Sequence, residues 1–377
     1  MANPHESALH YPFGDALPAT GTTLEVAPGV RWLRMPLPFA LDHINLWLLH
    51  DRLDGVDGWS VVDCGVTSDA TRAAWEQVFA TQLQGLPVLR VIVTHMHPDQ
   101  SLDLPACARH WEALIESGVS ALIVCGSLGE NQTLLPEEKR TVVKHALAVA
   151  AGRVPVVCGV AEMSTQAAIR YLHDCEKLGA AGFMVMPPMV YKPDPRETQH
   201  WFRTLAAATP LSWMLYNNPV GYHTDVTPET FVELADIPNL LAIKESSANT
   251  RRITELRNLA GDRYRIFTGV DDLFLESAIL GIDGWVCGSG IAFPKENQQL
   301  WDLAQAGRWD ECRALYRWSQ PLMKLDTHLH FVQYIKLLCQ ETGLGNEWVR
   351  EPRLPLAGAE REQVLNIIRD ALAKRPA

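Results

Sequence analysis

LLAIKESS, residues 240–247, is the stretch of sequence that decides the fold. Four apolar residues run without interruption into Lys244, and polar residues follow. A continuous apolar run, in place of strict alternation, is typical of a parallel strand that is buried on both faces. A lysine near the end of such a strand is either paired with an anion or is a desolvated amine. Desolvation lowers the pKa of an amine and frees its lone pair to attack a carbonyl carbon.

The same rhythm of apolar strand, loop and amphipathic helix extends from Leu102 through most of the remaining sequence. A helix is predicted to begin at Pro136, which is followed by two acids in the first turn. The helical connections have the length that parallel crossovers need. The predicted strands lie in VSALIVCGSLGE, VPVVCGV, AAGFMVMPPM, LSWMLYNNP, LLAIKESS, YRIFTGVDD and GWVCGSGIAFP.

These seven strands are one short of a closed barrel of eight βα units. Three further helical stretches follow the last strand, from about residue 296 to residue 374. The predicted fold class for residues 99–377 is therefore α/β, a (β/α)8 TIM barrel with C-terminal helices.

The amino-acid composition argues against some classes of binding partner. Of the 377 residues, 47% are hydrophobic and 20% are charged, which is the balance of a soluble globular protein. The formal net charge of -11 argues against nucleic acid or an anionic membrane as the main partner. No basic and apolar leader opens the sequence, no apolar run approaches 18 residues, and the eight cysteines form no CxxC pair. A cytoplasmic protein with reduced cysteines is expected.

Four motifs carry a resemblance to a known family, and they are GSLGE (126–130), YNNP (216–219), AIKESS (242–247) and FTGVDD (267–272). In this order, and each at the end of a predicted strand, they resemble the dihydrodipicolinate synthase/N-acetylneuraminate lyase family over about residues 99–375. The resemblance implies a class I aldolase-type barrel in which Lys244 forms a Schiff base with a 2-oxo acid. It also implies a homo-oligomer, and it calls for no cofactor and no metal.

The resemblance also implies roles for the other motif residues. Tyr216 matches the family's tyrosine that moves protons to and from the Schiff base, although a tyrosine here could also be a core ring with its hydroxyl at the rim. Gly126, Ser127 and Leu128 belong to the loop that would hold the substrate carboxylate through backbone N–H groups. An ordinary glycine turn is the alternative for that loop. The remaining substrate-binding candidates, in FTGVDD and GWVCGSG, are Gly269 and Val286.

Two departures from the synthase pattern indicate the substrate. Synthases have a relay threonine where this sequence has Leu128, and an arginine follows their tyrosine motif, whereas YNNPVGYHT contains none. GSLGEN, YNNPVGY, GWVCGSGIAFPKE and VREPRLPL resemble the 1-pyrroline-4-hydroxy-2-carboxylate deaminases. That branch implies attack of Lys244 on C2 of the cyclic imine, loss of the 4-hydroxyl, and release of 2,5-dioxopentanoate and ammonia. The alternative is a dehydratase or aldolase that acts on a 2-keto-3-deoxy sugar acid.

Residues 1–98 differ from the rest of the sequence, because short strand-like runs alternate there with turns. VVDCGV (61–66) and VIVTHMHPD (91–99) resemble the N-terminal strands of a metallo-β-lactamase-fold hydrolase. His95, His97 and Asp99 match its HxHxDH motif, but Gln100 stands where the next histidine belongs. Zinc needs at least three protein ligands in suitable geometry, so no catalytic metal is expected.

This truncated segment suggests two hypotheses about the junction. Residues 90–95 could serve as the missing first barrel strand, or the barrel could be an imperfectly closed seven-stranded one with the N-terminal piece attached. The sequence also allows two other classes of function. One is a metal-dependent hydrolase that uses His95 and His97, and the other is a fusion protein without catalytic activity.

Overall fold

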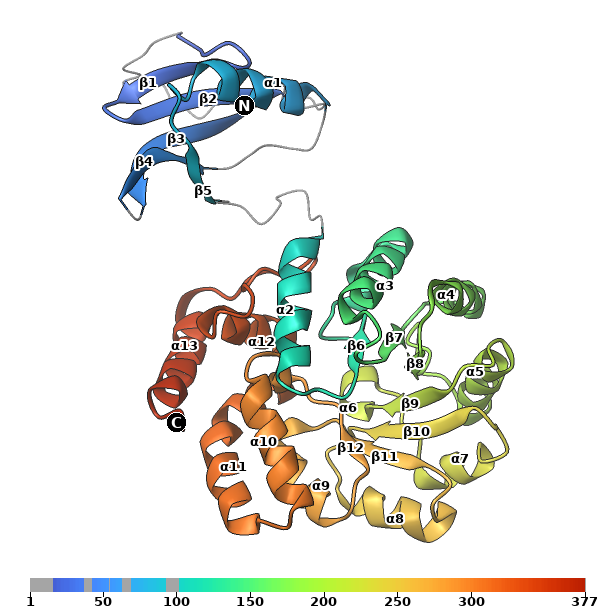
Figure 1. Cartoon of the computed structure of the whole chain (residues 1–377). Helices are drawn as coiled ribbons and strands as arrows, with labels where there is room; N and C mark the ends of the chain where they lie inside the picture. Colours follow the sequence, from blue (N-terminus) through green and yellow to red (C-terminus); the bar gives the residue numbers. More distant parts are fainter. Residues whose placement is uncertain (1–15, 37–42, 54, 63–68, 93–101, 377) are drawn as a thin grey trace. The chain divides into compact units, whose positions relative to one another are not determined.

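The structure is a computed structural model that describes residues 16–36, 43–53, 55–62, 69–92 and 102–376 (Figure 1). The chain divides into two compact units, Met1–Ser101 and Leu102–Ala377. Each unit has its own hydrophobic core, and each is described by itself.

The N-terminal unit is built on one five-stranded sheet in the order β1-β2-β3-β4-β5. Strands β1 to β4 are antiparallel neighbours, whereas β5 runs parallel to β4 and is reached through helix α1. Alternate residues such as Leu46 and Leu48 of β3 are fully buried, and they pack in one cluster with Ala74 and Val78 of α1. The bounds are β1 Thr23–Ala27, β2 Val30–Pro36, β3 His43–Leu53, β4 Val56–Val62, α1 Asp69–Thr81 and β5 Val88–Ile92.

The hypothesis that residues 90–95 form the first barrel strand does not match this topology. Residues 90–92 belong to β5, which pairs with β4 through the register Ser60↔Arg90 and Val62↔Ile92. The rest of that segment, with His95, His97 and Asp99, lies outside the described residues. The described part of this unit forms a single sheet, whereas the metallo-β-lactamase fold packs two sheets together. The predicted likeness to that fold is therefore not confirmed.

The C-terminal unit contains a curled sheet of seven parallel strands in the order β12-β11-β10-β9-β8-β7-β6, with helices around its outside (Figure 1). All seven strands predicted from the sequence are confirmed. The expected closed barrel of eight strands is not, because β6 pairs only with β7, and β12 only with β11, within the described residues. The strands are β6 Leu122–Val124, β7 Val156–Val160, β8 Gly182–Val185, β9 Trp213–Asn217, β10 Leu240–Glu245, β11 Arg265–Thr268 and β12 Gly284–Trp285.

Helices cover the outer face of these strands, and the main core lies between the two layers. The helix expected at Pro136 begins there, with Glu138 accepting a hydrogen bond from the backbone N–H of Leu135 at 2.8 Å. Among the described residues, no helix is both long enough and apolar enough to cross a bilayer. The helices around the strands are α2 Leu104–Glu116, α3 Pro136–Ala150, α4 Thr165–Leu178, α5 Pro195–Ala207, α6 Pro219–Tyr222, α7 Pro228–Glu233, α8 Arg251–Ala260 and α9 Phe274–Ile279.

The predicted C-terminal helical region is confirmed and forms two further clusters of buried residues. Its α-helices are α10 Pro294–Gln305, α11 Trp309–Met323, α12 Phe331–Glu341 and α13 Gly358–Ala373. Short 3-10 turns occur at η2 Asn131–Thr133, η3 Asp271–Leu273, η4 Ser289–Ile291 and η5 Lys324–Thr327. Three of these turns directly follow strands or their loops, and η5 joins α11 to the loop before α12.

Candidate active site

Lys244 and Tyr216 lie side by side at the carboxyl ends of two neighbouring strands. They are register partners in the parallel pair β10–β9, so the fold of the sheet brings them together. Lys244 Nζ lies 3.9 Å from the centroid of the Tyr216 ring. The two residues are only 9% and 6% exposed. A cationic or developing-cationic nitrogen over the face of a phenol ring is a favourable arrangement.

Burial sets the acid–base behaviour of this pair. It lowers the pKa of Lys244, and the nearby Tyr222, Asp326, Asp271 and Cys287 oppose that shift. Burial likewise raises the pKa of Tyr216. A lysine with a lowered pKa is more often the neutral amine, which is the form that attacks a carbonyl or imine carbon.

A second tyrosine, which the sequence reasoning did not single out, joins the site from α6. The Tyr222 ring meets Tyr216 edge-on, with ring centroids 5.4 Å apart. Its hydroxyl forms a short hydrogen bond with Ser127 Oγ of the GSLGE loop. Burial raises the pKa of Tyr222. Tyr222 was visible in YNNPVGY, but nothing in that motif shows that its hydroxyl reaches another loop.

The GSLGE loop has the backbone geometry of an anion-binding turn. Cys125 before the loop and Glu130 at its end both adopt left-handed φ angles, 55° and 57°. Within the described residues, the N–H groups of positions 126–129 donate no hydrogen bond. Successive free N–H groups in such a turn can bind a carboxylate. The loop N–H groups at Gly126 and Ser127 are therefore without a hydrogen-bond partner in the described residues, and the role predicted for them in substrate binding stays a prediction.

Leu128 differs from the other loop residues. Its side chain packs against the cluster of buried residues formed by the C-terminal helices. Its predicted contribution to substrate binding is therefore limited to its backbone in this conformation.

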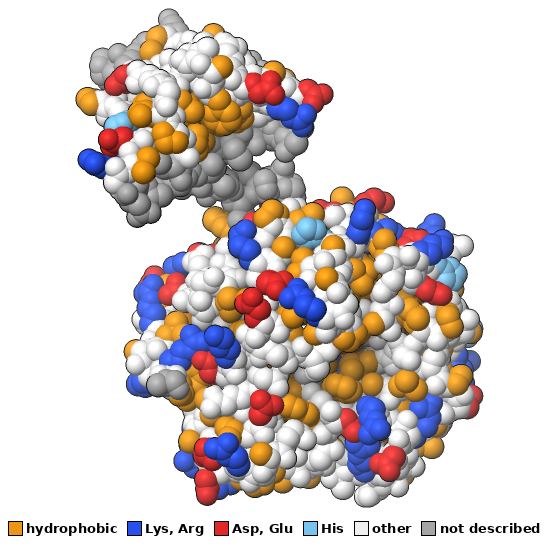
Figure 2. Space-filling model, in the orientation of Figure 1, with side chains coloured by type: hydrophobic (Ala, Val, Ile, Leu, Met, Phe, Trp, Pro, Cys, Tyr) orange, Lys and Arg blue, Asp and Glu red, His pale blue; other side chains and the backbone are white. Residues whose placement is uncertain are grey.

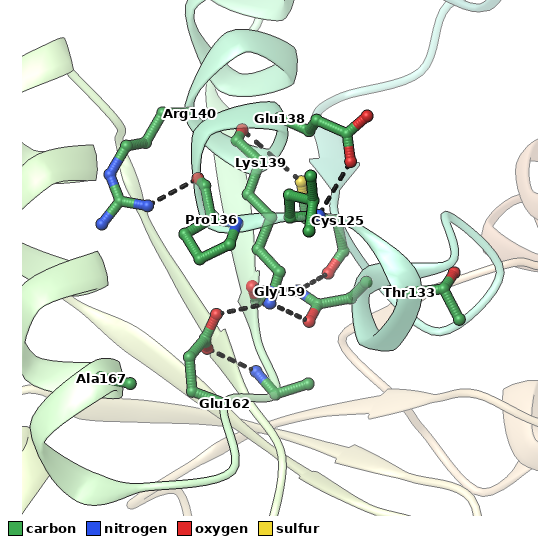
Figure 3. A network of polar contacts seen from close by, with 12 residues as sticks. Cys125, Thr133, Pro136, Glu138, Lys139, Arg140, Gly159, Glu162 and Ala167 are labelled. Atoms are coloured by element: carbon green, nitrogen blue, oxygen red, sulfur yellow. Dashed lines mark hydrogen bonds and ion pairs between the residues drawn. The ribbon is translucent and has the colours of Figure 1, made fainter. Parts of the chain in front are cut away.

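Buried polar contacts hold this loop in place from beneath (Figure 3). Asn131, which follows the loop, donates from Nδ2 to the carbonyl oxygens of Cys125 and Gly159 at 2.7 and 3.1 Å. Lys139 of α3 donates from Nζ to Asn131 Oδ1 at 2.8 Å and to Glu162 at 2.7 Å. A buried amide with all its partners made fixes its surroundings well, because any displacement leaves a buried polar atom unpaired.

The two other predicted substrate-binding residues have different surroundings. An ideal Cβ at Gly269 would lie 2.3 Å from Lys244 Cε and 2.2 Å from Ser246 Oγ, so the absence of a side chain gives Lys244 its room. Val286 packs in the cluster of the barrel interior that contains Tyr216 and Met184. Its backbone N–H donates to Thr268 at 3.0 Å. The structure thus places Gly269 against Lys244 and Val286 in the apolar cluster around Tyr216.

Two acidic groups, Asp271 and Asp326, act electrostatically on Lys244. Asp271, which follows β11, is fully buried and accepts hydrogen bonds from Trp285 Nε1 at 2.9 Å and from the Ser289 N–H at 2.6 Å. Asp326 comes from η5, in the C-terminal helices, and burial together with Asp271 raises its pKa well above the usual range. Nothing in the sequence around Asp326 pointed to the site.

One group of side chains in the described residues has the composition of a metal site. Ligand atoms of His328, His330 and Glu360 lie within 4.8 Å of one another. Glu360 Oε1, however, is 2.8 Å both from His330 Nδ1 and from the Tyr334 hydroxyl. We assign these residues to that hydrogen-bonded cluster, and none of the residues predicted for the site belongs to it.

On the face of the C-terminal unit drawn in Figure 2, basic and acidic side chains are interspersed.

Comparison with known proteins identifies the family. The model of the dihydrodipicolinate synthetase family matches residues 85–371. The chain belongs to the dihydrodipicolinate synthetase family. It is 30% identical over 292 residues to a 4-hydroxy-tetrahydrodipicolinate synthase of Shewanella sp. (strain W3-18-1), covering 75% of this chain and 95% of the relative. A synthase of the same name from Desulforamulus reducens is 31% identical over 282 residues, covering 74% and 95%.

Solved structures of the dihydrodipicolinate synthetase family agree with the fold. The dihydrodipicolinate synthase of Acinetobacter baumannii, complexed with pyruvate, superposes with a TM-score of 0.70 at 28% identity and covers 74% of this chain and 96% of its own. A prophage protein of the family from E. coli K12, also complexed with pyruvate, gives 0.69 at 25% identity and covers 73% and 94%. The chain is accordingly a Schiff-base-forming enzyme of the class I lyase and aldolase type.

Proposed function

We propose that Lys244 is the amine that forms the Schiff base and that Tyr216 transfers protons to and from it. The observation that carries this proposal is the buried contact of 3.9 Å between Lys244 Nζ and the Tyr216 ring, at the carboxyl end of adjacent strands. Active sites of barrels of this type lie at that end of the strands. The loop N–H groups at Gly126 and Ser127 would hold the substrate carboxylate, and the Ser127–Tyr222 hydrogen bond would extend the proton path from Tyr216.

The substrate class follows from the carboxylate loop and the lysine. The bound molecule is a pyruvate-like 2-oxo acid or its cyclic imine, whose C2 the Lys244 amine attacks. Two structural relatives are complexes with pyruvate. Family members are typically oligomers, and we extend that expectation to this chain.

Within this class we propose the conversion of 1-pyrroline-4-hydroxy-2-carboxylate to 2,5-dioxopentanoate and ammonia. Synthesis of 4-hydroxy-tetrahydrodipicolinate, the activity named for the relatives above, brings in a second substrate with its own carboxylate. The YNNPVGYHT stretch contains no arginine that could bind that second carboxylate. With Leu128 in the place of the relay threonine, the site lacks two features of the synthase pattern.

The alternative substrate is a 2-keto-3-deoxy sugar acid, which the same residues could dehydrate or cleave. It has the same carboxylate and C2 carbonyl, and it differs in carrying no ring nitrogen. Release of ammonia therefore separates the two proposals.

One experiment tests the proposed function directly. The purified enzyme is incubated with the cyclic imine, with a 2-keto-3-deoxy sugar acid, or with pyruvate plus aspartate semialdehyde, and ammonia, aldehyde and condensation product are measured. Each incubation is repeated with borohydride, and the protein mass is determined. We expect ammonia from the cyclic imine and a covalent adduct on Lys244.

Matched lysine variants supply the control. Lys244→Ala should abolish both turnover and adduct, whereas Lys144→Ala, at an exposed position of α3, should retain both. Turnover of Lys244→Ala above about a hundredth of wild type would refute the Schiff-base role. Condensation with aspartate semialdehyde, without ammonia from the cyclic imine, would refute the proposed substrate. The likeness of residues 1–98 to a metallo-β-lactamase-fold segment remains a prediction, and no activity is proposed for it.

A further inference from the structure

Asp326 comes from the C-terminal helices and contacts the loop that follows β12. It lies in η5, between the C-terminal helices α11 and α12. Its carboxyl nevertheless stands against the loop that follows β12, because an ideal Cβ at Gly288 would lie 2.3 Å from Oδ1 and 2.5 Å from Oδ2. Asp326 and Lys244 act on each other electrostatically, so each is among the groups that shift the other's pKa.

Asp326 and Asp271 are two neighbouring acids with different surroundings. Asp271 is fully buried, and its oxygens accept hydrogen bonds from Trp285, Gly288 and Ser289. Through these hydrogen bonds, Asp271 holds the loop after β12 in place. The Asp326 side chain takes part in no hydrogen bond within the described residues, and burial is the main cause of its raised pKa. Its carboxyl therefore has no hydrogen-bond partner among those residues to hold it, and it lies at Gly288, two residues after Val286, which packs with the Tyr216 cluster.

We propose that Asp326 is the general acid that protonates the hydroxyl leaving from C4 of the substrate. This inference rests on the proposed Schiff base at Lys244 and specifies the substrate as a 2-oxo acid, or its imine, that carries a hydroxyl two carbons from C2. It assigns the enzyme to dehydrating chemistry in preference to aldol cleavage.

The step balances without any oxidant or further reactant. Once Lys244 is joined to C2 as an iminium, a base removes a proton from C3, and the C–H electrons form the C2=C3 double bond of an enamine. The nitrogen lone pair then restores the iminium while the C3=C4 bond forms and the C4–O bond breaks. The departing oxygen takes the proton of Asp326 and leaves as water. Proton exchange with the solvent and the tyrosine hydroxyls then deprotonates the base that took the C3 proton and reprotonates Asp326.

The surroundings of Asp326 suit this role. Hydroxide is a poor leaving group, so a proton donor beside C4 lowers the barrier of the elimination. Burial and the Asp271 carboxylate raise the pKa of Asp326 well above the usual range, which favours the protonated acid. The proposed cyclic imine and the alternative 2-keto-3-deoxy sugar acids both carry a 4-hydroxyl, so the role is the same for either.

The test compares leaving groups in Asp326→Asn and a matched control, Asp272→Asn. Asp272 also acts electrostatically on Asp326, but it is not among the main groups that shift the pKa of Lys244. The substrates are the 4-hydroxy cyclic imine and 4-chloro-2-oxopentanoate, from which chloride leaves without a proton. Borohydride trapping of pyruvate, read as protein mass, reports Schiff-base formation on the same samples.

We expect Asp326→Asn to lower turnover of the hydroxy substrate by roughly 10²–10⁴-fold, the usual range for a positioned acid. Chloride release and pyruvate trapping should both stay within about threefold of wild type, as should all activities of Asp272→Asn. Retained trapping also shows that the variant is folded, and Asp326→Ser serves as a second variant if the asparagine protein is insoluble.

Three results would overturn the inference. Asp326→Asn could turn over the hydroxy substrate at the wild-type rate, or it could lose chloride release as severely as water release, or Asp272→Asn could show the same pattern. Absence of a pyruvate adduct in the wild-type enzyme would overturn the proposed function, and this inference with it. An adduct in the wild type together with an unaffected Asp326→Asn overturns only the role of Asp326.

Discussion

Gly269→Ala tests whether the room beside Lys244 sets the position of the reactive amine. The new Cβ would lie 2.3 Å from Lys244 Cε and 2.9 Å from its Cγ. Carbon atoms in contact are about 3.5–4.0 Å apart, so the methyl group and the lysine must separate by about 1 Å or more. A displacement of about 1 Å at a reacting group can cost about 10²-fold in rate. We therefore expect Schiff-base formation with pyruvate to slow by about 10²-fold.

The assay is a timed quench with borohydride, in which the adduct mass is followed from milliseconds to minutes under single-turnover conditions. The control is Gly284→Ala, because a Cβ there would lie 2.2 Å from Cε1 of Phe267, which is an equally close contact in the same barrel. Overpacking of either kind costs about 1–3 kcal/mol of stability, so both variants should unfold at lower temperature. Only Gly269→Ala should slow trapping in the folded protein. Wild-type trapping by Gly269→Ala, or equal slowing by both variants, would refute the reasoning.

Three further predictions address the proton path, the charge of the lysine and the chain junction. Tyr216→Phe should lower turnover by roughly 10²–10⁴-fold, and an effect on substrate affinity alone would exclude a proton-transfer role. Because burial lowers the pKa of Lys244, the rate of adduct formation should fall as the pH drops through that lowered pKa. The midpoint of this pH dependence should lie below about 10.4, the pKa of an ordinary lysine, and a midpoint at or above that pH would contradict the prediction. Deletion of residues 1–86 keeps residues 87–371 of the part that the family model matches, whereas deletion of residues 1–98 removes a further twelve residues of it. The shorter deletion should therefore give more soluble protein. Equal soluble yield and thermal unfolding of the two truncations would show that residues 87–98 contribute nothing to the C-terminal unit.

The sequence predicted the features that lie on strands. Apolar runs gave all seven strands of the C-terminal unit, and the order of the motifs placed Lys244 and Tyr216 on two consecutive ones, which are neighbours in a sheet of this type. The assignment of residues 90–95 to the first barrel strand stays a prediction, because residues 90–92 pair with β4 in the described structure while the family model matches from residue 85 onward. A pairing choice depends on contacts far along the chain, which a local pattern does not contain.

The features that were missed are carried by loops and by the C-terminal helices. Tyr222 reaches Ser127 across 95 residues of sequence, and Asp326 reaches the loop at Gly288 from η5. Neither contact is accompanied by a residue spacing or a periodicity that can be recognised in a single sequence. Side chains that approach a site from different elements are identified only once the fold has brought those elements together.

Leu128 and Asp326 together explain how this site departs from the synthase pattern. Leu128 stands where synthases have a relay threonine, and its side chain packs against a cluster that includes Leu325, the residue before Asp326. If the proposed function holds, an apolar side chain at this position carries no proton and instead packs beside the turn that carries Asp326. Packing of Leu325 in this cluster helps to hold the next residue, Asp326, against Gly288. On this reasoning the two positions form one functional unit, in which the loop supports the acid proposed for dehydration in place of relaying a proton itself.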